Sequence, residues 1–130
     1  MTTKTLSKSE TATKLKTDLP RFTGTDYWYK HELSKLTYTD GVKYLAEIAQ
    51  CYWLIDIVGS LYFHPDKLME KEDFLGIKLV VNESDNSAVF TADDGNGNIL
   101  YTQNIPFTDF PLTNIKLFCA NDVLLLPSEY

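Results

Sequence analysis

Residues 75–92 read LGIKLVVNESDNSAVFTA, and in this stretch the hydrophobic pattern of the chain changes from helical to alternating. Ile77, Leu79 and Val81 lie on one face of an extended chain, because successive side chains of a strand point to opposite faces. The polar run NESDNS supplies the turn residues that return the chain into SAVFTA. We therefore predict a β-hairpin here.

Further apolar runs, separated by turn residues, follow this hairpin. DDGNGN precedes ILYTQNIPF, FTDFPLT leads into IKLFCA, and Asn121-Asp122 precedes VLLL. Asn and Asp tolerate positive φ, so Asn121-Asp122 suits a two-residue hairpin turn. The pattern predicts an antiparallel β-meander of about five strands over residues 75–126, with each strand beside its neighbour in sequence.

The sequence before residue 75 is typical of helices. Ser7 and Glu10 have the spacing of a capping box, which predicts a short helix that ends near Leu19, before Pro20. We also predict a short helix over residues 26–35, capped by Thr25.

The longest predicted helix runs from about Asp40 to Val58. Thr39 or Asp40 can cap its start, and Gly59 is a natural residue for its end. After Pro65, the run DKLMEKEDF predicts a short exposed helix or turn. The long helix is expected to pack across one face of the sheet.

These elements predict an α+β fold in two layers, with N-terminal helices packed on a C-terminal antiparallel meander. A chain of 130 residues with 44% apolar content suits one hydrophobic core. We therefore expect a single domain over residues 1–130, with residues 1–6 as a disordered tail.

The formal charge of the chain at pH 7 is −6. Residues 1–22 sum to +3, so the remainder carries −9. Because an acidic body repels phosphate, we expect no nucleic-acid binding through a basic face except at the N-terminal arm; an acidic surface that mimics DNA stays open as an alternative. We expect no membrane span, because the best candidate, residues 44–63, contains Glu47 and Asp56.

Cysteine usage indicates a reducing compartment. Cys51 and Cys119 lie 68 positions apart, and the chain opens with neither a basic nor an apolar region of a secretory signal. We expect two free, buried thiols in the cytoplasm. The Cys and His residues lack the spacing of a zinc site, so no metal or cofactor is expected.

Several short stretches together resemble a family of short bacterial proteins of unknown function: YTDGVKYLAE at 38–47, YWLID at 52–56, DGNGN at 94–98, FTDFPL at 107–112 and LLLPSEY at 124–130. The resemblance covers the chain from about Leu19 to the end. It implies a bacterial, cytoplasmic, single-domain protein, and it implies no activity, cofactor or catalytic residue.

Asp56 is the carboxylate inside YWLIDIVGS, the most apolar run of the chain. On one continuous helix, a rotation of 100° per residue places Asp56 on the apolar stripe near Leu45 and Tyr52. A buried carboxylate must be hydrogen-bonded, paired or protonated. Three interpretations stay open: an anchor bonded to a Tyr, Trp, backbone N–H or His31; a general base or ligand group in a cleft; or a side chain exposed near the helix end.

His31 and His64 are the remaining candidates for catalysis. His64 follows the long helix closely enough to fold back beside Asp56, but a His before a Pro is more often a surface or capping residue. Cys51 is expected to be a buried thiol rather than a nucleophile, because no basic side chain is predicted beside it.

Two other motifs have competing explanations. Asp94, Asn96 and Asn98 match the first three ligand positions of a calcium loop, but Ile105 stands where the bidentate Glu belongs, so we predict an exposed hairpin loop without metal. The apolar residues of FTDFPL either fill the core, which we favour, or form a patch for a partner.

Two functions stay open. The favoured one is a protein-interaction or assembly module, in which the sheet face or the aromatic segment with Tyr27 and Trp28 contacts a protein partner or a second copy. The alternative is a small enzyme or ligand-binding domain with a helix–sheet pocket around Asp56, beside Tyr52 and Trp53. An enzyme is disfavoured because the sequence shows no nucleophile–base set, phosphate loop or metal cluster.

Overall fold

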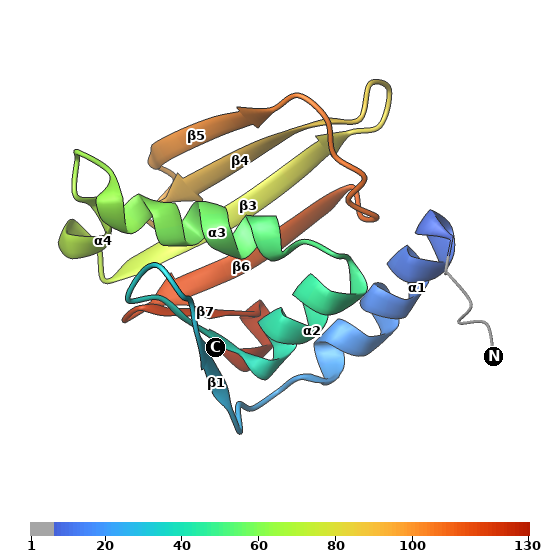
Figure 1. Cartoon of the computed structure of the whole chain (residues 1–130), viewed down its shortest axis with the longest axis horizontal. Coiled ribbons are helices and arrows are strands. Elements are labelled where there is room, and N and C mark those ends of the chain that lie inside the picture. Colours follow the sequence, from blue (N-terminus) through green and yellow to red (C-terminus); the bar gives the residue numbers. More distant parts are fainter. Residues whose placement is uncertain (1–6) are drawn as a thin grey trace.

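Helices cover one face of a seven-stranded sheet in residues 7–130, the part of the chain that the computed structural model describes (Figure 1). This arrangement confirms the predicted α+β class. The predicted tail, residues 1–6, lies outside the described residues. The elements in chain order are α1 (Lys8–Asp18), η1 (Leu19–Arg21), β1 (Trp28–Lys30), β2 (Thr37–Thr39), α2 (Asp40–Ile48), α3 (Tyr52–Ser60), η2 (Leu61–Phe63), α4 (Leu68–Lys71), β3 (Phe74–Asn82), β4 (Ser87–Asp93), β5 (Ile99–Ile105), β6 (Asn114–Ala120), β7 (Val123–Leu125) and η3 (Pro127–Glu129).

The sheet is mixed, with the strand order β1-β2-β7-β6-β3-β4-β5. The five antiparallel strands predicted for residues 75–126 are present as β3–β7. The predicted adjacency is wrong at one place, because β6 pairs with β3 instead of β5. The sheet also gains two strands that were not predicted, β1 and β2, and β2 pairs with β7 in parallel. The connection 106–113 contains Pro106 and Pro111 and is too long for a tight hairpin, so the chain crosses back to the other edge of β3 (Figure 1).

The tight turns agree with the sequence prediction. Asn121 and Asp122 have φ of 51° and 67° and join β6 to β7 as a hairpin. Residues 83–86 join β3 to β4, and residues 94–98 join β4 to β5, where Gly95 and Gly97 adopt φ of 83° and 90°. Residues that readily adopt a left-handed backbone conformation therefore occupy the hairpin turns.

The helix predicted over residues 26–35 is wrong, because β1 lies there and pairs with β2. Tyr29 and Tyr38 lie opposite each other, with ring centroids 5.7 Å apart. Aromatic and β-branched residues favour strands when a partner strand is available, and the Thr-rich β2 supplies that partner. The loop between them closes with a hydrogen bond from the His31 N–H to the Leu36 carbonyl at 2.9 Å.

The predicted helix over residues 40–58 is wrong in its continuity. Thr39 caps its start as predicted, but α2 ends at Ile48 and Gln50 adopts a left-handed φ of 53°. The Cys51 N–H donates to the Ala46 carbonyl at 2.9 Å, which is the closing bond of a Schellman motif. This position usually holds Gly, so Gln50 gave no signal of the break.

The core lies between α3 and the covered face of the sheet (Figure 1). α3 contributes Leu54, Ile55 and Val58, all buried. The sheet contributes large side chains with no more than 1% exposure: Leu75, Ile77, Leu79, Phe90, Leu117 and Leu124. The predicted packing of a helix across one sheet face is therefore confirmed, although the helix involved is the shorter α3.

The C-terminal segment caps the N-terminal end of α2 through the side chain of Glu129. The Glu129 carboxylate accepts hydrogen bonds from the hydroxyl of buried Thr39 at 2.6 Å and from the backbone N–H groups of Leu126 and Gly41 at 2.9 and 3.3 Å. A carboxylate at a helix N-terminus also interacts favourably with the helix dipole. Glu129 thus joins the chain end to α2.

Candidate functional site

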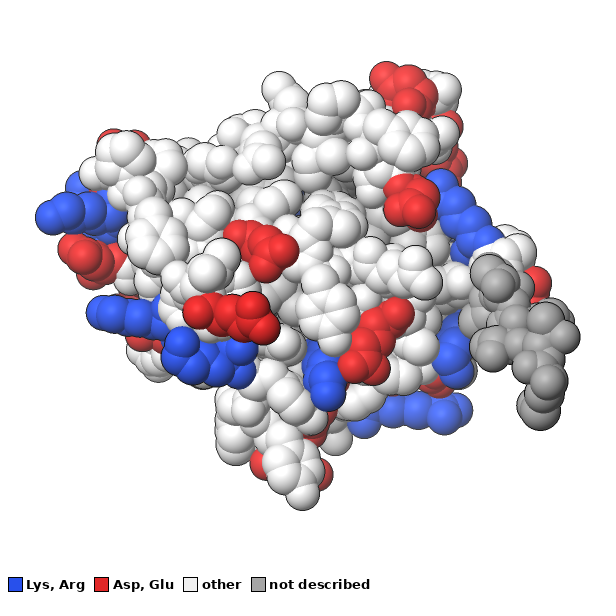
Figure 2. Space-filling model, in the orientation of Figure 1, with Lys and Arg blue, Asp and Glu red and all other residues white. Residues whose placement is uncertain are grey.

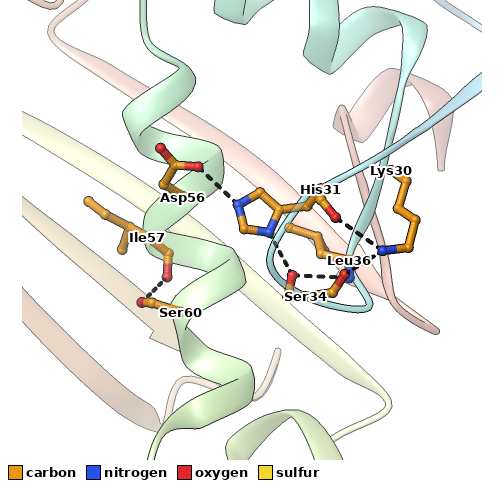
Figure 3. Close-up of polar contacts among 7 residues, drawn as sticks. All are labelled: Lys30, His31, Ser34, Leu36, Asp56, Ile57 and Ser60. Atoms are coloured by element: carbon orange, nitrogen blue, oxygen red, sulfur yellow. Dashed lines mark hydrogen bonds and ion pairs between the residues drawn. The ribbon is translucent and has the colours of Figure 1, made fainter.

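His31 is the buried centre of a polar network that joins the β1–β2 loop to α3 (Figure 3). Its side chain is only 9% exposed. The imidazole packs against Gly59 so closely that a Cβ at that position would lie 2.5 Å from His31 Cε1. Gly59, predicted to end the helix, instead lies inside α3 and makes room for this ring.

Both ring nitrogens of His31 have polar partners. Nε2 lies 2.9 Å from Asp56 Oδ1, and Nδ1 lies 2.8 Å from Ser34 Oγ. For a neutral imidazole beside an ionised carboxylate, Nε2 carries the proton and its N–H donates a hydrogen bond to Asp56, while Nδ1 accepts a hydrogen bond from the Ser34 hydroxyl. Ser34 Oγ also accepts from the Leu36 N–H at 3.3 Å.

The prediction that Asp56 lies on the apolar stripe is wrong, because its side chain is 69% exposed. The left-handed Gln50 separates α2 from α3, so the helical phase counted from Leu45 does not continue to Asp56. Two of the open interpretations hold together: Asp56 is exposed, and it bonds to His31.

The order Ser34–His31–Asp56 is that of a serine-hydrolase relay, but the details favour a structural tie. In such a relay the serine contacts Nε2 and the carboxylate contacts Nδ1, whereas here the two nitrogens are exchanged. Lys30 Nζ further lies 3.3 Å from the carbonyl oxygens of His31 and Ser34. Apart from Asp56, these partners belong to one short segment, so the network holds the hairpin against α3.

His64 does not join this network. Its Nδ1 accepts from the Asp66 N–H at 3.1 Å, and its ring contacts the edge of Tyr101 with centroids 5.4 Å apart. The expectation that His64 folds back beside Asp56 is not met. The structure therefore brings two of the three catalytic candidates, His31 and Asp56, together and leaves the third, His64, in a capping position.

The four predicted contact residues fall into two places. Tyr27 and Trp28 are exposed at the β1 edge of the sheet. Tyr52 is partly exposed on α3 and donates to Glu47 at 3.2 Å. Trp53 packs edge-on against buried Phe110, with centroids 6.4 Å apart.

A groove of about 430 Å³, hereafter the α3–β5 groove, lies between these two elements. Trp53 and Ile57 of α3 form one wall, and residues 103–109 form the other. Phe107 in that second wall is 68% exposed, whereas Phe110 of the same segment is buried. The prediction that FTDFPL fills the core is therefore correct for Phe110 and Leu112 and wrong for Phe107.

A second groove, of about 640 Å³, lies beside the β1–β2 loop. Ser34 lines it, together with side chains of mixed charge: Lys30, Glu32, Lys35, Glu70 and Asp122. Asp56 lines neither groove. A helix–sheet pocket around Asp56, which the alternative function requires, is thus not formed by these grooves.

The two thiols and the calcium-like loop have the local structures that the sequence predicted. Cys51 and Cys119 are free and buried, and burial raises the pKa of each thiol to about 12. Asp94 accepts hydrogen bonds from the Asn98 side chain and from the backbone N–H groups of Asn96 and Asn98. These bonds lower the pKa of Asp94, with the Asn98 side chain as the largest cause.

The chain belongs to the family of unknown function DUF6876, whose model matches residues 13–130. No curated protein and no solved structure matches it. The match confirms membership of a family of unknown function and assigns no residue a role. In residues 7–130, no helix has both the length and the apolar character needed to cross a bilayer.

Proposed function

We propose that this member of the family is a protein-interaction module and that the α3–β5 groove is its binding site. The observation that carries the proposal is the exposed Phe107 beside the partly buried Trp53 and Ile57. Burial of apolar surface stabilises a complex by about 25 cal/mol per Å². Aromatic side chains beside such grooves are typical anchors of protein interfaces.

The alternative, an enzyme or ligand-binding domain around Asp56, has less support. Asp56 is exposed and lines neither groove, and its partner His31 is buried beneath Gly59. A reacting group must reach both the base and a bound substrate. The thiols do not replace Asp56, because burial keeps them protonated near neutral pH.

We also propose that the module acts in the cytoplasm of a bacterium. The resemblance stated above supports the bacterial source, and the two free thiols support the compartment, since disulfides are rare in reducing compartments. Fractionation of source cells, with the chain detected by antibody, tests this placement.

A matched pair of variants tests the binding site. Phe107 and Tyr27 are both 68% exposed, and they lie at the α3–β5 groove and near the β1 edge, respectively. The immobilised chain captures its partner from an extract of source cells, and the purified partner is then titrated against wild type, Phe107→Ser and Tyr27→Ser. Thermal melts of the three proteins check that each is folded.

We expect Phe107→Ser to weaken binding at least tenfold and Tyr27→Ser to change it less than about twofold, since tenfold corresponds to about 1.4 kcal/mol. The reverse result would move the site to the β1 edge. Equal affinity of all three proteins would overturn the assignment of either aromatic surface.

A further inference from the structure

β5 forms an exposed edge that lacks the usual protection against strand pairing. It lies at the end of the sheet and pairs with β4 alone among the described strands. Its seven residues, ILYTQNI, contain neither a charged residue nor a proline. Natural proteins protect edge strands with short length, charge or proline. β1, at the opposite end of the sheet, has such protection, because it is three residues long and ends in Lys30.

The sequence around β5 has a charge of one sign. Between Lys78 and Lys116 the chain has no Lys, Arg or His, and its only charged residues are Glu83, Asp85, Asp93, Asp94 and Asp109. In Figure 2 the surface over β5, at the upper left and centre, is white, the red group at the upper right lies over the β3–β4 turn of Figure 1, and the blue side chains lie lower on the molecule.

The acidic residues lie at both ends of the β5 edge. Asp93 and Asp94 lie where β5 begins, and Asp109 lies in the groove beyond its end. The Thr108 N–H donates to the Asn86 carbonyl at 2.8 Å, which brings this end of the groove beside the acidic β3–β4 turn. The strand itself is therefore uncharged along its length and has carboxylates at both ends; His64 contacts Tyr101 of β5, and Lys78 lies two strands away in register with Thr102.

We propose that an extended, basic segment of a partner protein adds to β5 as an eighth strand. Its backbone pairs with the free edge, its apolar side chains enter the α3–β5 groove, and its Lys or Arg residues approach the acidic ends. This inference rests on the proposed function and adds the binding mode and the chemistry of the partner. A second copy is not the favoured occupant, because pairing two β5 edges brings together two segments 79–115, each of which has five acidic residues and no basic residue.

Defined peptides test the binding mode by NMR, which detects complexes of millimolar affinity. The ¹⁵N-labelled chain is titrated with the basic peptide KVTVKVTVK, the acidic peptide EVTVEVTVE, and the basic peptide N-methylated at its three central residues. Consecutive N-methyl groups block hydrogen bonding at both edges of the peptide and keep its charge and side chains. Titrations at two salt concentrations measure the electrostatic contribution.

We expect the basic peptide to shift the amides of residues 99–105 and the Trp53 indole. The acidic and the methylated peptides should bind at least tenfold more weakly than the basic peptide. Added salt should lower the affinity for the basic peptide. Thr102, exposed on β5, provides a matched charge pair. Thr102→Lys should bind the basic peptide at least threefold more weakly than Thr102→Glu does. Both variants lose the threonine side chain, so the difference between them reports the charge.

Each of three results would overturn the inference of strand addition without deciding whether the protein is an interaction module. Equal binding of the methylated peptide means that side chains enter the groove without strand addition. If the acidic peptide binds as tightly as the basic one, the partner segment need not be basic and that part of the inference is wrong. If no amide of residues 99–105 shifts at millimolar peptide, the β5 edge is not a docking site. In each case the comparison of Phe107→Ser with Tyr27→Ser decides the interaction module independently.

Discussion

The contact between His31 and Gly59 predicts that Gly59→Ala destabilises the wild-type protein but stabilises a variant that lacks the His31 ring. In a helix interior, Gly→Ala normally stabilises by about 0.5–1 kcal/mol, because Gly loses more backbone entropy on folding. At position 59, however, a Cβ would lie 2.5 Å from His31 Cε1 and 2.7 Å from Nδ1. The ring cannot move freely, because Asp56 and Ser34 hold its two nitrogens.

Overpacking of this kind costs about 1–3 kcal/mol, which exceeds the gain in helix propensity. We therefore expect Gly59→Ala to lower the free energy of unfolding by about 1–2 kcal/mol in the wild-type background. In a His31→Ala background the obstacle is gone, and the same change should raise the free energy of unfolding by about 0.5–1 kcal/mol.

Urea unfolding of wild type, the two single variants and the double variant measures this difference, with an expected coupling energy of at least about 1.5 kcal/mol. Gly24→Ala is the control, because no heavy atom lies within 4 Å of a Cβ at position 24, and its effect should stay within about 0.5 kcal/mol. A stabilising Gly59→Ala in the wild type would refute the packing of His31 beneath α3.

Four further predictions concern single side chains. Asp56→Ala should cost no more than about 1 kcal/mol, because the side chain is largely exposed, and Asp56→Asn should cost less; urea melts measure both. Glu129→Ala should cost about 1–3 kcal/mol in the same assay, because it leaves a buried hydroxyl and backbone N–H groups without their acceptor. Cys51 and Cys119, each with a pKa of about 12, should react with Ellman's reagent at pH 8 only after urea unfolds the chain. Asp94 has a depressed pKa, so the stability lost in Asp94→Asn should be present near neutral pH and disappear as the pH falls through that pKa, and calorimetry should show no heat with millimolar calcium beyond dilution.

The amino-acid sequence by itself determined the features whose causes are local. Ser7 and Glu10 form the predicted capping box, and Thr39 caps α2. Asn121 and Asp122 form the predicted hairpin turn, and the alternation after residue 75 produces β3 and β4. Each feature depends on interactions between residues a few positions apart, so it can be predicted without knowing the tertiary structure.

The candidate site was only partly predictable. His31 was one of several named partners for Asp56, but the periodicity that selected Asp56 assumed one continuous helix. Gln50 breaks that helix in a left-handed conformation that Gly or Asn would have signalled. Phe107 gave no signal of its exposure, because Phe110 in the same apolar segment is buried.

Only the tertiary structure decided the strand order and the environment of the site. Residues 28–30 become a strand because β2 lies beside them, and β2 itself pairs with β7, which is more than 80 residues away in sequence. The connection 106–113 takes β6 to the far edge of β3, and this crossing leaves β5 as a free edge beside α3. Such pairings depend on backbone hydrogen bonds and packing between distant segments, and these energies exist only after the chain has brought the segments together.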